Sequence, residues 1–171
     1  MGRMAARPEG EGRESLRTYL YRLLLRHPCT RKEAADRLAG RGGDPNDVRR
    51  LVTEFEEMGL IDDENWARLY VEGHSDRGAA RLRHELRQRG VAENTIDQVL
   101  EEGDDQAKAE DLAAEWSARG LEWKKIAARL VRRGFSSRTV SRILRNTQNF
   151  EEFEEFEEFE KEESFPPLRE D

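Results

Sequence analysis

The hydrophobic positions of this chain recur in three copies, which align when three Arg-Gly dipeptides are superimposed. The dipeptides are Arg41-Gly42, Arg89-Gly90 and Arg133-Gly134, so the glycines are 48 and then 44 residues apart. Five apolar positions match around each glycine: Ala34, Leu38, Val48, Leu51 and Val52, then Leu82, Leu86, Ile96, Val99 and Leu100, then Ile126, Leu130, Val140, Ile143 and Leu144. A repeat of this kind predicts a tandem array of one supersecondary unit instead of a single enzyme-like core.

Within each copy the apolar residues recur at helical spacing, and no alternating strand pattern competes with it. Each copy therefore predicts three short helices. The expected parts are a flexible N-terminus (1–13), three-helix repeats over 14–59, 60–103 and 104–146, and an acidic tail (147–171). Because one such repeat buries little apolar surface, we expect neighbouring repeats to stabilise one another. The predicted fold is all-α, an elongated curved array of three tandem three-helix repeats followed by a disordered acidic C-terminal tail.

Turn and capping residues mark the expected helix ends. Thr30 and Glu33 have the spacing of a capping box, and Asp44 with Pro45 provides an N-cap followed by proline at the first helical position. Gly42 suits a left-handed helix exit. The expected helices run from Glu14 to Arg26, from Thr30 to the turn at Gly42, from Asp44 to near Gly59, and over 62–76, 78–89, 92–102, 104–119, 121–133 and 136–145, with Ser136 as a further N-cap.

Composition limits the class of protein. Charged residues make up 39% of the chain and hydrophobic residues 36%, and no apolar run approaches the roughly 20 residues that a membrane span needs. The segment Met1–Gly12 has no apolar core of a secretory signal. A single cysteine, Cys29, forms no internal disulfide and fits a reducing cytosol. We expect a cytoplasmic protein that contacts no membrane, with a monomer as the expected state.

The net charge of −7 combines two regions of opposite sign. Residues 150–171 contain 11 acidic and 2 basic residues (net −9), which leaves 28 basic and 26 acidic residues (net +2) before them. The basic residues that we predict to contact an anionic partner are Arg81, Arg83, Arg87, Arg89, Lys124, Lys125, Arg129, Arg132, Arg133, Arg138, Arg142 and Arg145. The predicted acidic contacts are Glu54, Glu57, Asp62, Asp63 and Glu64. For any one cluster, a solvated helix face remains an equal alternative.

The aromatic residues have two possible uses. Trp66 and Tyr70 lie four residues apart on one helical face, and Trp116 and Trp123 flank the turn at Gly120. Stacking on nucleic-acid bases is one use of such rings. Packing between repeats is favoured, because these residues fall within the apolar stripes. We therefore expect Trp66 and Tyr70 in the core.

Catalytic motifs are not apparent in the sequence. His27, His74 and His84 are scattered, Cys29 has no partner at metal-ligand spacing, and the chain has no glycine-rich phosphate loop. Carboxylates are so abundant that no pair stands out as an acid and a base. The sequence predicts a protein that is not an enzyme and that needs no cofactor or metal.

The middle repeat contains Gly59–Val71 (GLIDDENWARLYV), Arg77-Gly78 and Arg81–Val91 (RLRHELRQRGV), and Thr30–Glu33 and Leu38 of the first repeat are in the same style. These segments resemble the RecX family of bacterial regulatory proteins. The matching pattern is an aspartate-initiated helix with an aromatic residue, alanine and Tyr-Val, followed by a basic helix that ends in Arg-Gly. It is most specific in the middle repeat and looser in the third.

This resemblance implies a protein of tandem three-helix repeats that binds the RecA recombinase and modulates its filament on single-stranded DNA. It also implies suppression of ATP hydrolysis and strand exchange, and thus a role in recombination, DNA repair and the SOS response. A curved, charged array could lie along the filament groove and touch several subunits. Basic faces would then meet phosphates or acidic recombinase surface, and direct contact with DNA is possible.

Two other functions stay open. Short three-helix units with a basic last helix also resemble helix-turn-helix proteins, in which 136–145 would be the recognition helix of a general nucleic-acid-binding protein. The repeats could alternatively form a scaffold with no link to nucleic acid. Salt-dependent DNA binding without a recombinase would favour the first of these, and no effect on either partner would favour the second.

The tail departs from the family pattern. Phe150, Phe153, Phe156 and Phe159 recur every three residues among paired glutamates, so they drift by about 60° per step around a helix and form no apolar stripe. One interpretation is a solubilising extension. Another is a mimic of nucleic acid that folds back onto the basic third repeat. A third is a linear motif that recruits another protein through Phe165 and the prolines after it.

Overall fold

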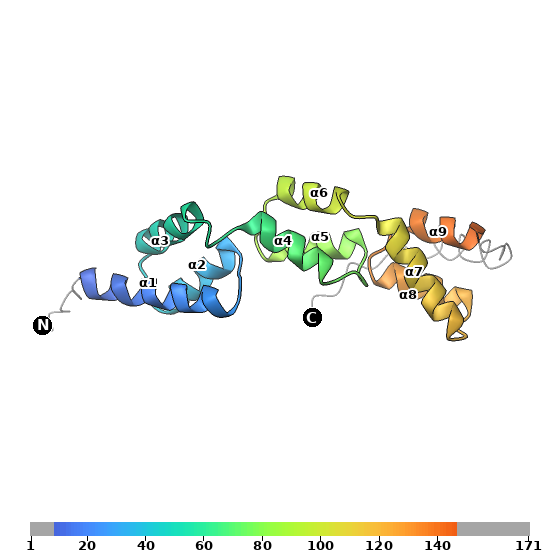
Figure 1. Ribbon diagram of the computed structural model, residues 1–171, viewed down its shortest axis with the longest axis horizontal. Helices are drawn as coiled ribbons and strands as arrows, with labels where there is room; N and C mark the ends of the chain where they lie inside the picture. The colour runs from blue at the N-terminus through green and yellow to red at the C-terminus, as the bar shows by residue number, and fades with distance from the viewer. Residues whose placement is uncertain (1–8, 147–171) are drawn as a thin grey trace, which may run out of the picture. The chain divides into compact units, whose positions relative to one another are not determined.

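The structure is a computed structural model that describes residues 9–146, with the side chains of residues 16–146. The described residues form α-helices and no strand, which confirms the predicted all-α fold (Figure 1). The helices are α1 (Glu9–Arg26), α2 (Arg31–Gly40), α3 (Pro45–Glu57), α4 (Asp63–Glu72), α5 (Ala79–Gln88), α6 (Glu93–Glu101), α7 (Asp105–Ala118), α8 (Trp123–Arg132) and α9 (Ser137–Asn146). The predictions for the tail and for residues 1–8 lie outside the described residues.

The predicted caps are confirmed where the sequence marked them. Thr30 accepts a hydrogen bond from the Glu33 N–H at 3.2 Å, and the Glu33 carboxylate accepts one from the Thr30 N–H at 3.4 Å. Asp44 accepts from the Asn46 N–H, at 2.9 Å. These bonds satisfy backbone donors that a helix start leaves without a partner.

Two predicted helix ends were wrong. Helix α1 begins at Glu9 and not at Glu14, because the polar residues before the apolar stripe include no proline to stop the helix. Helix α4 ends at Glu72 and not at Asp76. The residues after Gly73 instead turn back, with the Arg77 N–H donating to the His74 carbonyl at 3.0 Å. The repeat boundaries drawn from the sequence stay a prediction.

The glycines of the three Arg-Gly dipeptides share one backbone conformation. Gly42, Gly90 and Gly134 have φ values of 81°, 81° and 87°, and they follow α2, α5 and α8. This left-handed region favours glycine, because a Cβ there approaches the following carbonyl oxygen. We call these the Arg-Gly turns. They confirm that the sequence repeat is also a repeat of backbone structure.

The described helices divide into two compact units, and the division passes through α5. The first unit takes the chain up to Gly73 together with Glu85–Val99, and the second takes His74–His84 together with the chain from Leu100. In the first unit α1, α2 and α3 pack around a core of Leu20, Cys29, Ala34, Leu38, Val48, Leu51, Val52, Phe55 and Ile61. In the second unit α7, α8 and α9 pack pairwise around Ala109, Ala113, Trp116, Ile126, Ala127, Leu130, Phe135, Val140, Ile143 and Leu144 (Figure 1). Through the part of the chain that the structure describes, no helix has the length and apolar character to cross a membrane.

Candidate functional site: a basic surface on the third repeat

The beginning of α2 docks on the second Arg-Gly turn, and we call this contact the first junction. The Thr30 hydroxyl donates to the Arg89 carbonyl at 2.7 Å, and the Arg31 N–H donates to the Asp63 carboxylate at 2.7 Å. Lys32 lies so close to Gly90 that a Cβ added there would sit 2.5 Å from the Cβ of Lys32. The first junction therefore joins the first repeat to the middle one through side chains.

The beginning of α5 docks on the third Arg-Gly turn in the same way, and we call this contact the second junction. The Gly78 N–H donates to the Arg133 carbonyl at 2.8 Å, and the Ala80 N–H donates to the Gly134 carbonyl at 3.2 Å. The Ala79 N–H donates to the Asp105 carboxylate at 3.1 Å. Gly78 and Ala79 thus take the places that Thr30 and Arg31 have in the first junction.

The arginines of these two turns are engaged within the junctions. Arg89 pairs with Glu33 at 2.6 Å, and its guanidinium lies 5.2 and 5.0 Å from the ring centroids of Trp66 and Tyr70. These rings stack on each other with centroids 5.0 Å apart. Both are only half-buried, so the prediction that they lie in the core was wrong, because Arg89 covers them in place of apolar side chains.

Arg133 repeats this arrangement in the second junction. It donates to the Asp76 carboxylate at 2.5 Å and to the Asp76 carbonyl at 3.0 Å, and its guanidinium lies 5.3 Å from the Trp116 ring centroid. Arg89 and Arg133 were both predicted to contact a partner. Their geometry makes them residues that hold successive repeats together.

Four of the five predicted acidic contacts also have internal roles. Glu54 pairs with Arg17 at 2.7 Å. Asp62 caps α4 by accepting from the Asn65 N–H at 2.9 Å, and Asp63 belongs to the first junction. Glu64 accepts from Arg68 at 3.1 Å and from Gln98 at 3.2 Å. Glu57 is exposed and makes no ion pair with another described residue.

Two junction carboxyls are half-buried. Burial raises the pKa of Asp63 above its ordinary value, and the backbone hydrogen bond from Arg31 opposes that rise. Burial likewise raises the pKa of Asp105, opposed by the hydrogen bond from Ala79. Each junction therefore contains a half-buried aspartate that has a raised pKa and accepts a backbone hydrogen bond.

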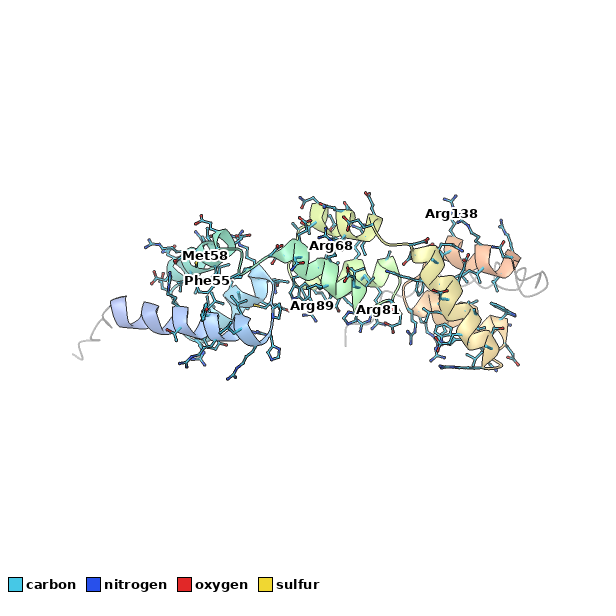
Figure 2. The ribbon with its side chains drawn as sticks, in the orientation of Figure 1. Phe55, Met58, Arg68, Arg81, Arg89 and Arg138 are labelled. Atoms are coloured by element: carbon cyan, nitrogen blue, oxygen red, sulfur yellow. The ribbon has the colours of Figure 1, made fainter. Side chains whose placement is uncertain are left out.

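The other basic residues predicted in the middle repeat lie on α5. Arg87 is exposed and forms two hydrogen bonds of 2.7 Å with the Glu93 carboxylate. Arg81 and Arg83 are half-buried, and the backbone of Arg81 approaches Gly134 in the second junction. Figure 2 labels Arg81 on this helix and Arg89, which follows directly after its end. Structural contacts thus engage much of the predicted basic face of α5.

Helix α8 carries four of the predicted contact residues, and their surroundings differ. Lys125 pairs with Glu122 at 2.8 Å, and the guanidinium of Arg129 lies 4.7 Å from the Trp116 ring centroid. Lys124 is exposed. Arg132 is also exposed, and it has no ion pair or ring contact with the rest of the described chain.

Helix α9 presents three arginines on one face. Arg138, Arg142 and Arg145 are exposed and follow one another at spacings of four and three residues, and we call them the α9 arginine stripe. Val140, Ile143 and Leu144 bury the opposite face in the core. Figure 2 shows Arg138 pointing from α9 into solvent. Arg138 and Arg142 have no ion pair within residues 16–146. Exposed guanidinium groups in a row are suited to bind phosphates or carboxylates.

Equivalent positions of the other two repeats lack this charge. The apolar register places Asn46, Arg50 and Thr53 of α3, and then Asn94, Gln98 and Glu101 of α6, where α9 has its three arginines. The three faces therefore carry charges of +1, −1 and +3. Helices α3, α6 and α9 have matching apolar positions on the inward face. They therefore differ in the charge of the outward face and not in the pattern of packing. Among these faces, the one on the third repeat is the candidate surface for an anionic partner.

A further surface was missed by sequence reasoning. Tyr21 and Leu25 of α1 are 50% and 71% exposed, and Arg22 and Arg26 lie beside them on the same side of the helix. The spacing of four residues between Tyr21 and Leu25, away from the buried leucines, was a signal that could have revealed it.

The described residues contain no group of three or more histidine, cysteine, aspartate or glutamate side chains arranged to hold a metal. Cys29 is 3% exposed, and burial raises the pKa of its thiol. A thiol held neutral in this way is a poor nucleophile. This cysteine therefore belongs to the core of the first unit.

Comparisons with known proteins agree on one family. Residues 62–100 match the family described as RecX, second three-helix domain. The "Regulatory protein RecX" of Halorhodospira halophila is 41% identical over 97 residues, which cover 56% of this chain and 60% of that protein, less than two thirds of its length. The protein of the same name from Streptomyces lividans is 35% identical over 144 residues, which cover 77% of each chain. The crystal structure of RecX from Lactobacillus salivarius superimposes with a TM-score of 0.72 at 21% identity, covering 80% of this chain and 96% of the other.

Proposed function

This chain belongs to the RecX family, whose named members are regulatory proteins, and on that premise we propose that it binds the RecA recombinase filament on single-stranded DNA. Binding would restrain the ATP hydrolysis and strand exchange of the filament. The protein acts in this proposal as a regulator and not as an enzyme. Its setting would be recombination and DNA repair in the cytoplasm.

The observation that carries the proposal is the α9 arginine stripe. Arg138 and Arg142 are exposed cations with no ion pair within the described chain, and Arg132 of α8 adds a third such charge to the same repeat. A nucleoprotein filament offers phosphates, which bind guanidinium groups strongly and in a salt-dependent way. The third repeat is therefore the proposed contact with the filament.

The junctions give the proposal its mechanical basis. Within its own compact unit, each of Arg89 and Arg133 holds an Arg-Gly turn to the helix start that docks on it. A protein that contacts adjacent recombinase subunits at once would oppose the small motions that hydrolysis requires. In this proposal Arg89 and Arg133 are positioning residues, while Arg132 and the stripe touch the partner. Glu57 stays a candidate contact for basic loops of the recombinase.

A general nucleic-acid-binding function is the second candidate. It is favoured by the exposed side of α9, where Ser141 lies between the arginines and could reach a base edge. This function would need no recombinase. It predicts that the protein acts only when it covers the DNA.

The test is single-stranded-DNA-dependent ATP hydrolysis by a bacterial RecA, with the protein added to preformed filaments at substoichiometric ratios. Binding to naked DNA is measured in parallel. We expect suppression at ratios too low to coat the DNA. Suppression that appears only when DNA is saturated would favour the second candidate, and no suppression would contradict filament regulation.

Matched variants locate the contact. Neutralising two charges of the stripe (Arg138→Gln with Arg142→Gln) should raise the concentration needed for half suppression by about tenfold or more, because each charge-assisted hydrogen bond contributes about 1.5–3 kcal/mol. The control neutralises Arg49 and Arg50 of α3, which are equally exposed and have no described ion pair. Equal losses in the two variants would show that overall charge, and not the third repeat, determines binding.

A further inference from the structure

Several arginines of the described chain have a carboxylate beside them. Arg87 has Glu93 at 2.7 Å, Arg119 has Glu115 at 2.5 Å and Arg133 has Asp76 at 2.5 Å. Arg138 and Arg142 have no such ion pair with any described residue. The exposed guanidinium groups of Arg138 and Arg142 can therefore bind an acidic partner.

The sequence that follows α9 has the required chemistry. Helix α9 ends at Asn146, and the segment Phe150–Glu163 (FEEFEEFEEFEKEE) begins four residues later. This segment contains nine glutamates and one lysine, for a net charge of −8. We call it the Phe/Glu segment. Its opposite charge and its short connection to the stripe are the two observations that identify it.

We propose that the Phe/Glu segment binds the α9 arginine stripe of the same molecule and competes there with the anionic partner. The binding of the segment to the stripe is independent of the proposed function. The competition with an anionic partner rests on the proposed function.

The short connection decides between the same molecule and a second copy. Three residues, Thr147 to Asn149, separate the end of α9 from the segment. A connection this short gives an effective concentration in the millimolar range. A second copy reaches such a concentration only in very concentrated solution, so the contact within one chain prevails at ordinary protein concentrations.

The chemistry of the contact makes it reversible. Glutamate carboxylates accept paired hydrogen bonds from guanidinium groups, as the two bonds between Arg87 and Glu93 do on α5. On an exposed face each pair is weak, and salt screens it over a distance of about 8 Å at physiological ionic strength. Several pairs are needed together, and a polyanion with denser charge displaces them. The segment would thus act as a selective filter against weak anionic partners.

Paramagnetic relaxation in the full-length chain tests the contact. A spin label is placed at position 156 through Phe156→Cys in a Cys29→Ala background, and the broadening of backbone amide signals is measured. At low salt we expect selective broadening of Arg138–Arg145, with little effect on Asn46–Thr53 of α3, which occupies the equivalent position in the first repeat. Adding about 0.5 M salt should remove it, because the Debye length then falls to roughly 4–5 Å.

Four results would overturn the proposal. The first is broadening that does not distinguish α9 from α3. The second is broadening of the exposed α1 face around Tyr21 and Leu25, which would mean that the phenylalanines and not the glutamates choose the site. The third is equal broadening when spin-labelled and isotope-labelled molecules are mixed, because this would make the contact intermolecular. Broadening that survives Arg138→Gln with Arg142→Gln would also contradict a role for the stripe.

A second measurement separates this proposal from the proposed function. Glu→Gln substitution at the nine glutamates should raise the affinity of the full chain for an oligo-dT probe at low salt by roughly threefold or more, since a tethered competitor in the millimolar range is removed. The oligo-dT probe should in turn reverse the broadening of α9. If the α9 signals are broadened but oligo-dT does not reverse the broadening, the contact with the segment stands and the competition is contradicted. Displacement without any effect on RecA would keep both and refute the recombinase as partner.

Discussion

The two junctions have the same geometry but are built from different parts of the chain. In the first junction the contact with the Arg-Gly turn comes from the Thr30 hydroxyl and the Lys32 side chain. In the second it comes from the backbone N–H groups of Gly78 and Ala80. A contact made by side chains can adjust by rotation about side-chain bonds, whereas a contact between two backbones cannot. The difference predicts that the second junction tolerates substitution less well.

The largest effect is expected at Gly78. A Cβ added there would overlap the backbone of Gly134 and Phe135, so Gly78→Ala should lower the free energy of unfolding by about 3 kcal/mol. Urea denaturation followed by circular dichroism measures it. The matched control is Gly40→Ala in α2, where an added Cβ meets no atom within 4 Å. A Gly78→Ala protein as stable as this control would show that the backbones can move apart.

The next largest effect is expected at Thr30, whose side chain makes the equivalent contact in the first junction. Thr30 is 0% exposed, caps α2 and donates to the Arg89 carbonyl, so Thr30→Ala removes a cap and leaves a carbonyl without its partner. We expect a loss of about 2 kcal/mol in the free energy of unfolding. Thr30→Ser keeps the hydroxyl and should restore most of it. If serine and alanine were equally damaging, packing of the methyl group would explain the loss better than the hydrogen bonds.

Smaller losses in the free energy of unfolding are expected at Gly42 and Gly90. Comparing them separates the contribution of the docked neighbour from that of the left-handed turn. Gly42→Ala meets no neighbour within 4 Å and suffers only from its positive φ, which costs about 1–2 kcal/mol. Gly90→Ala has the same φ and also approaches Lys32, so it should cost about 1 kcal/mol more. Thermal unfolding of both variants gives the difference. Identical losses would mean that Lys32 moves aside freely.

The smallest effect is a dependence on pH that the junctions share. Burial raises the folded-state pKa of Asp63 and Asp105, so the folded chain binds more protons than the unfolded chain between the unfolded and folded pKa values. Their contribution to stability is therefore full below the ordinary aspartate pKa and is lost as the pH rises through the raised one. Compared with the unsubstituted chain, Asp63→Asn and Asp105→Asn should therefore change the free energy of unfolding more favourably at pH 7 than at pH 3. Unfolding curves at the two pH values test this, and an asparagine that destabilises equally at both would contradict it.

Local signals in the sequence predicted much of the fold. Thr30, Asp44 and Ser136 marked helix starts correctly, since a cap depends on residues within one turn. The Arg-Gly turns were found because their glycines need a conformation that other residues avoid. The start of α1 was missed because helix continues through polar residues that carry no apolar signal.

The candidate surface could be predicted only in part. The sequence could not distinguish Arg138 and Arg142 of α9 from the engaged Arg89 and Arg133. The acidic partners of Arg89 and Arg133 lie 56 and 57 residues away in the sequence. Such pairs exist only once the repeats have docked. Comparing the three outward faces at equivalent positions was possible from the sequence, and that comparison now singles out the stripe.

The open turn at Gly42 has a consequence for how such a protein can change in length. It has the backbone conformation of the two docked turns, yet an added Cβ there would meet nothing within 4 Å. A duplicated repeat placed ahead of α1 would therefore find a docking turn already formed, and would need only its own helix start to match. Repeat number in this architecture is thus open to gain by gene duplication, without redesign of the repeats already present.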